Sequence, residues 1–138
     1  MSTSPSFFAT PNVGIAQIAN ADASAYKDLF TAGASGSKVV AITAASDDAS
    51  LAHVVQLSLV RSATVYPLGA VNVPISAGSV SGTPAVDLLQ SNVIPGLPVD
   101  NDGQRYLFLM SGDKLQVKSL STMTAAKLLS VVAIGADA

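Results

Sequence analysis

The chain has 138 residues, no cysteine and a formal net charge of −2 at pH 7. That length allows one domain with one hydrophobic core. The lack of cysteine excludes a disulfide-stapled secreted design and a thiolate metal site, and the weak negative charge offers no basic footprint for nucleic acid.

Charged residues make up only 12% of the chain, about half of the roughly 25% found in ordinary soluble domains. The surface must then consist largely of Ser, Thr, Ala, Val and Gly, and neutral surfaces of this kind suit packing against other protein. We therefore expect an oligomer or an assembly subunit, with a weakly charged monomer as the alternative. All nine acidic residues are Asp, which favours turns, whereas Glu favours helices.

The N-terminal residues, MSTSPSFFAT, lack the basic region and long apolar core of a signal peptide. No uncharged apolar run reaches the roughly 18 residues of a membrane span, so we expect a soluble protein made in a cytoplasm, without a membrane partner. Residues 1–25 have little periodicity and predict an extended N-terminal arm, with one short strand near residues 13–18. The pair Phe7–Phe8 favours an arm that lies on a neighbouring protein; a flexible tail is the alternative.

Residues 26–138 predict a single all-β domain, an antiparallel β-sandwich or jelly roll of about eight short strands. The clearest strand is 52–60, where Val55, Leu57 and Leu59 share one face. Pro67 and Pro74 place the strand 64–75 at a sheet edge, or break it at a bulge near Gly69. Further strands are expected at 28–31, 38–45 and 128–134, a strand or helical turn at 85–90, and an ambiguous segment that could start a short helix at 120–126.

Residues 97–117, LPVDNDGQRYLFLMSGDKLQV, predict a hairpin at the centre of this domain. The clusters 100–103 and 111–113 are rich in Asp, Asn and Gly, which accept the backbone angles of tight reversals. An apolar run lies between them at 105–110, and polar and apolar residues alternate in 114–117. We therefore expect these two runs to pair with each other.

Few residues of this sequence have the accompanying residues that a catalytic or metal-binding site requires. His53 is the only histidine, and a triad or histidine-ligated metal site needs further groups around it, so we interpret it as a residue at a sheet end. Residues 100–103 superficially match the start of a calcium loop, but that motif closes with Glu, which this chain lacks. A turn explains them better.

Three other patterns have simpler structural interpretations. Asp47 and Asp48 are adjacent on an expected loop without a cleft, and are interpreted as solvated turn acids. Residues 33–38, GASGSK, differ from a phosphate loop because Ser separates Gly36 from the Lys and a strand follows. Tyr66, Tyr106 and Phe108 suit core or interface packing rather than base stacking. We expect no catalytic residue, no cofactor and no metal site.

The order of segments adds a family resemblance. DLFTAGASGSKVVAITAASDDA precedes VVQLSLV, VYPLGAVNVP, SGTPAVDLL and IPGLPVDNDGQRYLFLMSGDKLQV, and the chain ends with VVAIGADA. This order over residues 28–138 resembles small virion proteins of tailed bacteriophages, of the head-decoration or capsid-stabilising type. The resemblance implies a β-sandwich subunit, often a trimer, which binds the major capsid protein on the outer capsid surface and bridges neighbouring capsomers.

The expected function is therefore that of a capsid decoration, or cement, subunit of the virion and not of an enzyme. One alternative is another virion part, such as a tail or head-completion subunit. The other is a small β-barrel module that binds sugars or metabolites; carbohydrate sites usually use Trp, and the chain has none. The residues expected to contact the partner are Phe7 and Phe8 on the arm, and Val93, Ile94 and Leu97 on an exposed apolar loop. Ile94 and Leu97 are equally compatible with plugging the end of the sandwich.

Overall fold

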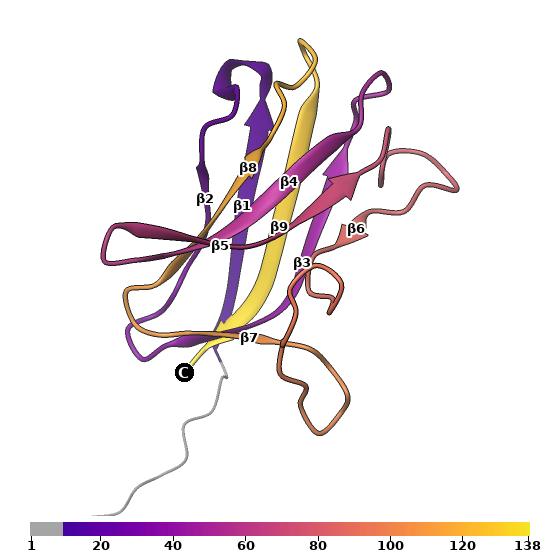
Figure 1. The fold of residues 1–138 in the computed structure, drawn as a ribbon. Coiled ribbons are helices and arrows are strands. Elements are labelled where there is room, and N and C mark those ends of the chain that lie inside the picture. Colours follow the sequence, from indigo (N-terminus) through magenta and orange to yellow (C-terminus); the bar gives the residue numbers. More distant parts are fainter. Residues whose placement is uncertain (1–9) are drawn as a thin grey trace, which may run out of the picture.

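The computed structural model describes residues 10–138, which form strands joined by turns and one short 3-10 helix (Figure 1). The residues that precede them, 1–9, lie outside this description. The elements are β1 (Thr10–Ala19), η1 (Asn20–Asp22), β2 (Lys27–Thr31), β3 (Ser37–Ser46), β4 (His53–Arg61), β5 (Thr64–Val73), β6 (Val86–Asp87), β7 (Leu107–Leu109), β8 (Lys114–Ser119) and β9 (Leu128–Asp137).

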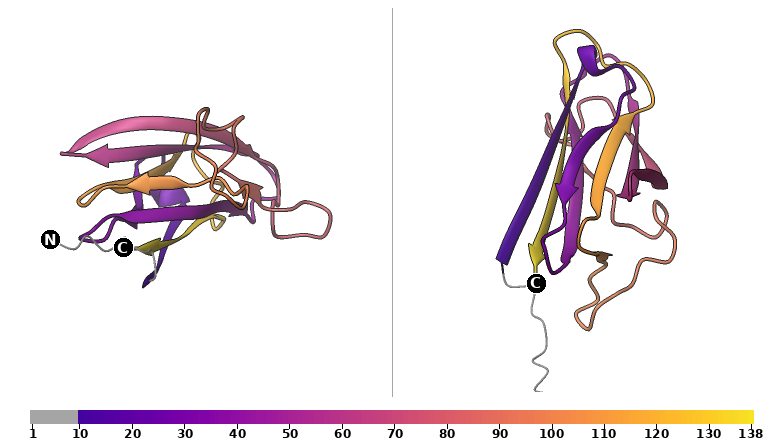
Figure 2. Two further views of the ribbon diagram at one scale, coloured as in Figure 1. Left: turned by 90° about the horizontal axis from the view of Figure 1, so that it is seen from below. Right: turned by 90° about the vertical axis from the view of Figure 1, so that its left-hand side faces the viewer.

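The strands form two antiparallel sheets that face each other, as the views in Figure 2 show. Sheet A has the order β1-β9-β3, and both β6 and β7 pair with the far edge of β3. Sheet B has the order β2-β8-β4-β5. The expectation of an all-β antiparallel sandwich is thus confirmed.

The pairing pattern assigns this sandwich to the jelly-roll type. The pairs β1·β9, β2·β8, β3·β7 and β4·β5 are those of one long antiparallel hairpin. Successive pairs lie alternately in sheet A and sheet B, so the hairpin is rolled up around the core. Jelly rolls consist of two such facing sheets.

The expected hairpin at 97–117 is wrong. β7 pairs with β3 in sheet A, whereas β8 pairs with β2 and β4 in sheet B. The turn between them therefore crosses from one sheet to the other. Local turn signals identify a reversal, but the strand next to it in space is chosen by the long-range pairs that bury the most apolar surface.

Period-two alternation identifies the core face in the first half of β4, but beyond the register shift Ser58 and Val60, which the alternation assigns to the other face, are buried. Val55 and Leu57 are fully buried, and Leu59 packs against the core while partly exposed. The strand β5 lies at the edge of sheet B, and its register with β4 shifts between Leu57 and Ser58, opposite Gly69 and Pro67. Both expectations for the proline-containing strand are met, because proline cannot donate to an interior ladder.

Part of the predicted arm belongs to the sandwich. β1 pairs with β9 along its whole length, from Thr10↔Asp137 to Ala19↔Leu128, so residues 10–19 form a sheet strand. Gly14 lets this strand approach β2 closely, since a Cβ built there would lie 1.9 Å from the carbonyl oxygen of Leu29. Residues 120–126, which could have begun a helix, form bends and turns.

Candidate functional site: the uncharged outer face of sheet A

The outer side of sheet A presents a surface without charge, which we call the A face. It consists of three rows that run across β1, β9 and β3 and that follow from the strand register. The rows are Val13–Ile134–Ala41, Ile15–Val132–Thr43 and Gln17–Ser130–Ala45. None of the nine residues is ionisable.

The A face carries some of the most exposed aliphatic side chains of the described residues. Val13 is 54% exposed, Ile15 is 68% exposed and Ile134 is 46% exposed. They face outward because side chains alternate along a strand, and their neighbours Ala16, Ile18 and Ala133 are in the core. A contiguous exposed apolar patch of this kind is typical of a surface that binds another protein.

A polar and aromatic border closes one corner of the A face. The Lys38 ammonium lies 4.6 Å from the centre of the Tyr106 ring and 3.6 Å from Asp100 Oδ2. The rings of Tyr106 and Phe108 meet edge to face, with centres 4.8 Å apart. An apolar area with a polar rim matches the anatomy of protein interfaces.

A buried polar cluster lies at the opposite end of the sandwich from this border. His53, the first residue of β4, and Asp48 are completely buried. The ring Nε2 lies 2.8 Å from Asp48 Oδ2, and Nδ1 lies 2.8 Å from Ser121 Oγ. In a neutral imidazole, Nε2–H donates to the carboxylate and leaves Nδ1 to accept from the Ser121 hydroxyl.

This cluster joins two loops that are distant in sequence. Asp48 also accepts hydrogen bonds from the backbone amides of Ser50, Leu51 and Thr124. The hydrogen bond with His53, followed by that from Thr124, holds the pKa of the Asp48 carboxyl well below its usual range. A Ser–His–Asp chain of contacts occurs in hydrolases, but here the imidazole is enclosed and cannot face a substrate, so the arrangement is an internal clamp.

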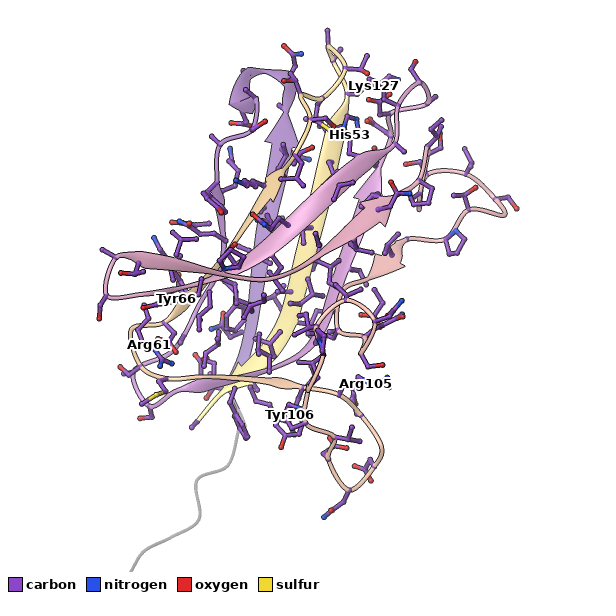
Figure 3. All side chains as sticks on the ribbon, viewed as in Figure 1. His53, Arg61, Tyr66, Arg105, Tyr106 and Lys127 are labelled. Atoms are coloured by element: carbon purple, nitrogen blue, oxygen red, sulfur yellow. The ribbon has the colours of Figure 1, made fainter. Side chains whose placement is uncertain are left out.

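The interpretation of Asp48 as a solvated acid is therefore wrong, and the partners of His53 were missed. Ser121 is 68 residues from His53 in the sequence, and no spacing pattern links them. The clamp arises because the ends of β4 and β8 are neighbours in sheet B, where Val55 pairs with Ser119. Figure 3 places His53 and Arg61 at opposite ends of β4.

An ion pair between Arg61 and Asp113 holds the crossing between the sheets. Arg61 contacts Asp113 through two parallel hydrogen bonds, Nε to Oδ1 at 2.7 Å and Nη2 to Oδ2 at 2.6 Å. The guanidinium lowers the pKa of the buried Asp113 carboxyl. Asp113 Oδ2 also accepts from the Met110 amide, and its carbonyl accepts from the Ala32 amide. These contacts fix the turn that carries the chain from β7 to β8.

Burial contradicts the expected exposure of the loop 92–98, and it agrees with the alternative in which Ile94 and Leu97 plug the sandwich. Val93 and Ile94 are buried in the core and Leu97 is half-buried against it, so this loop covers the sandwich instead of projecting from it. Gly69 of β5 permits the approach, since a Cβ there would lie 2.1 Å from the Val93 carbonyl oxygen. Phe7 and Phe8 lie outside the described residues, and their role stays a prediction.

The turn interpretations hold at two other motifs. Asp100 Oδ1 accepts from the amides of Asp102 and Gln104, both at 2.9 Å, so the carboxylate caps a tight reversal. Residues 33–38 connect β2 to β3 through a turn in which the Gly36 amide donates to the Gly33 carbonyl. A phosphate loop would instead join a strand to a helix.

The chain is similar to a pentameric capsid protein isolated from metagenomic phage sequences, with 19% identity over 91% of this chain and 68% of that chain, at a TM-score of 0.38. No protein-family model and no curated protein matches the chain.

Within residues 10–138, no cluster of three or more His, Cys, Asp or Glu could hold a metal ion. A helix with the length and apolar character of a membrane span is likewise absent from this range.

Proposed function

We propose that this chain is a bacteriophage structural protein, a head-decoration subunit that binds the major capsid protein on the outer capsid and bridges neighbouring capsomers. The A face is the observation that carries the proposal. The sparse charge of the chain and the segment order described above also support it. The jelly-roll order is compatible, but capsid subunits, lectins and cupins all use it, so the fold alone does not select a function.

The proposed mechanism is binding without a chemical step. Apolar side chains such as Ile15 and Ile134 are exposed in the isolated chain, and each loses contact with water when the A face meets a partner. Burial contributes about 25 cal/mol per Å² of apolar surface, and a stable interface buries about 1,600 Å² in total. A subunit that spans two capsomers would oppose their separation, because opening the joint would expose this area again.

Because many copies bind one capsid shell, each individual contact with the capsid can be weak. Two contacts on one subunit raise the effective concentration of the second to the millimolar range. The proposal therefore needs no single tight site. The resemblance implies a trimer; the mass of the chain in solution tests that number directly.

The test uses purified protein and empty capsids of the phage that encodes it. Co-sedimentation and electron microscopy should place the protein on the outer capsid surface, and Ile134→Lys, on the middle strand β9 of the A face, should weaken binding at least tenfold. Leu120→Lys is the matched control, since Leu120 is 50% exposed in the loop that follows β8 of sheet B. Density on the tail would support the alternative virion role, and failure of the native chain to bind capsids would refute the proposal.

A further inference from the structure

The two sheets have four lateral edges, and three of them carry devices that block pairing with another strand. β2 is short, carries charges at Lys27 and Asp28, and has a register shift next to Asp28. β5 contains Pro67 and a register shift. The far edge of β3 is covered by β6 and β7, which have only two and three residues. Short strands, charges, prolines and bulges are the usual means of protecting an edge.

The fourth edge, β1, has few of these devices. It has ten residues, no ionisable side chain and a register with β9 that runs without interruption. Pro11 is its single proline and lies at the second position, near the start. The strand forms the outer border of the molecule in the right-hand view of Figure 2. Every second backbone N–H and C=O of an edge strand points away from its sheet. β2 of sheet B contacts β1 at Gly14 and through the hydrogen bond from Asn12 Nδ2 to the Thr31 carbonyl, but the two strands form no ladder.

We propose that β1 pairs with β1 of a second copy of this chain in antiparallel orientation, so that sheet A continues across a two-fold axis. Such an interface is isologous, because the same strand serves both copies. The absence of charge on β1 is what permits it, since like charges directly opposite each other would repel.

The register that centres the axis on Gly14 gives the best match of side chains. Val13 then lies opposite Ile15 of the second copy, and Ile15 opposite its Val13. The most exposed aliphatic residues of the strand become a four-residue apolar cluster on the joined A faces. Cross-strand pairs of β-branched side chains stabilise a sheet. Pro11 meets Gln17 of the second copy at either end, away from the axis.

The size of the contact agrees with a real interface. In this register residues 10–18 of each copy overlap, and an antiparallel pair of that length forms about ten main-chain hydrogen bonds, the number in a typical interface. The joined A faces would also double the length of the uncharged surface that the proposed capsid contact uses. The inference rests on the β1 edge and not on the proposed function. It predicts two copies where the resemblance implies three, and the mass in solution distinguishes these numbers.

The test measures the mass of the full chain over a range of concentrations by analytical ultracentrifugation. We expect a two-copy species that grows with concentration. Ile15→Lys should shift the protein to one copy over the same range, with at least a tenfold weaker association, because a lysine on an edge strand opposes pairing. Leu120→Lys, with a lysine in the loop that follows β8, should associate like the native chain. Circular dichroism of both variants checks that the fold is retained.

Amide hydrogen exchange then distinguishes edge pairing from stacking of the A faces. In the two-copy species, consecutive amides along β1 should be protected, whereas stacking would protect only the alternate amides that already pair with β9. A chain that stays single at high concentration, a three-copy species without a two-copy one, or alternate protection would overturn the inference. Capsid binding is measured on the native chain, because Ile15 also belongs to the A face, so failure of the pairing and failure of the decoration role can be told apart.

Discussion

Replacing Gly14 with alanine should cost more stability than any other glycine-to-alanine change in a strand of sheet A, because it separates the two sheets. A Cβ at this position would lie 1.9 Å from the carbonyl oxygen of Leu29 and 2.9 Å from its carbonyl carbon. Ordinary van der Waals contact begins at 3.4 Å. The strands β1 and β2 would therefore have to move apart by about 1.5 Å (3.4 − 1.9), since the obstacle is backbone and cannot rotate away.

That movement disturbs the core. Leu29 and Phe30 of β2 are almost fully buried, and a gap of 0.5 to 1 Å already removes roughly a quarter to a half of a dispersion contact. We expect Gly14→Ala to destabilise the fold by about 3 kcal/mol, at the upper end of overpacking changes. For a chain of this size the melting temperature should fall by about 12 °C.

The assay is urea unfolding followed by circular dichroism, with Gly103→Ala as the matched control. Gly103 has a positive φ of 81° and no atom within 4 Å of an added Cβ, so alanine there meets only backbone strain of about 1 kcal/mol. If Gly14→Ala is no more destabilising than Gly103→Ala, then β1 does not approach β2 closely, and the two sheets do not meet at this side of the jelly roll.

Three further predictions concern the core and the ion pairs. Leu57→Ala should cost about 2–5 kcal/mol, as buried leucines do, whereas Leu120→Ala, at a half-exposed site, should stay within about 0.5 kcal/mol; chemical denaturation of both checks this. Arg61→Lys should lower the melting temperature, because lysine cannot make the two parallel hydrogen bonds to Asp113, and an unchanged melting curve would contradict that role. The pKa values of Asp48 and Asp113 are lowered in the folded state. The two carboxylates therefore stabilise the fold fully above about pH 4, and this contribution is lost as the pH falls through the folded-state pKa values. The urea midpoints at pH 7, 4 and 3 should decrease in that order.

The sequence by itself determined the class of fold and most strands. Alternation in 52–60, β-branched residues in 38–45 and prolines in 64–75 are local signals, and the strands β4, β3 and the edge strand β5 appear where these signals lie. Composition also indicated a surface with little charge, and the A face is one surface whose nine residues include no ionisable side chain. Such features depend only on residues that are close in sequence or on the overall composition, so they can be predicted without knowing which strands pair.

The tertiary structure alone decided which strands are neighbours. It placed β7 and β8 in different sheets, made residues 10–19 a strand of sheet A, buried Val93 and Ile94, and brought Ser121 to His53. Each of these depends on contacts between residues far apart in the chain, and the gain from burying apolar surface is nearly independent of direction. Local sequence can therefore name the strands, but the arrangement that encloses the whole core selects their partners, and with them the face that remains exposed.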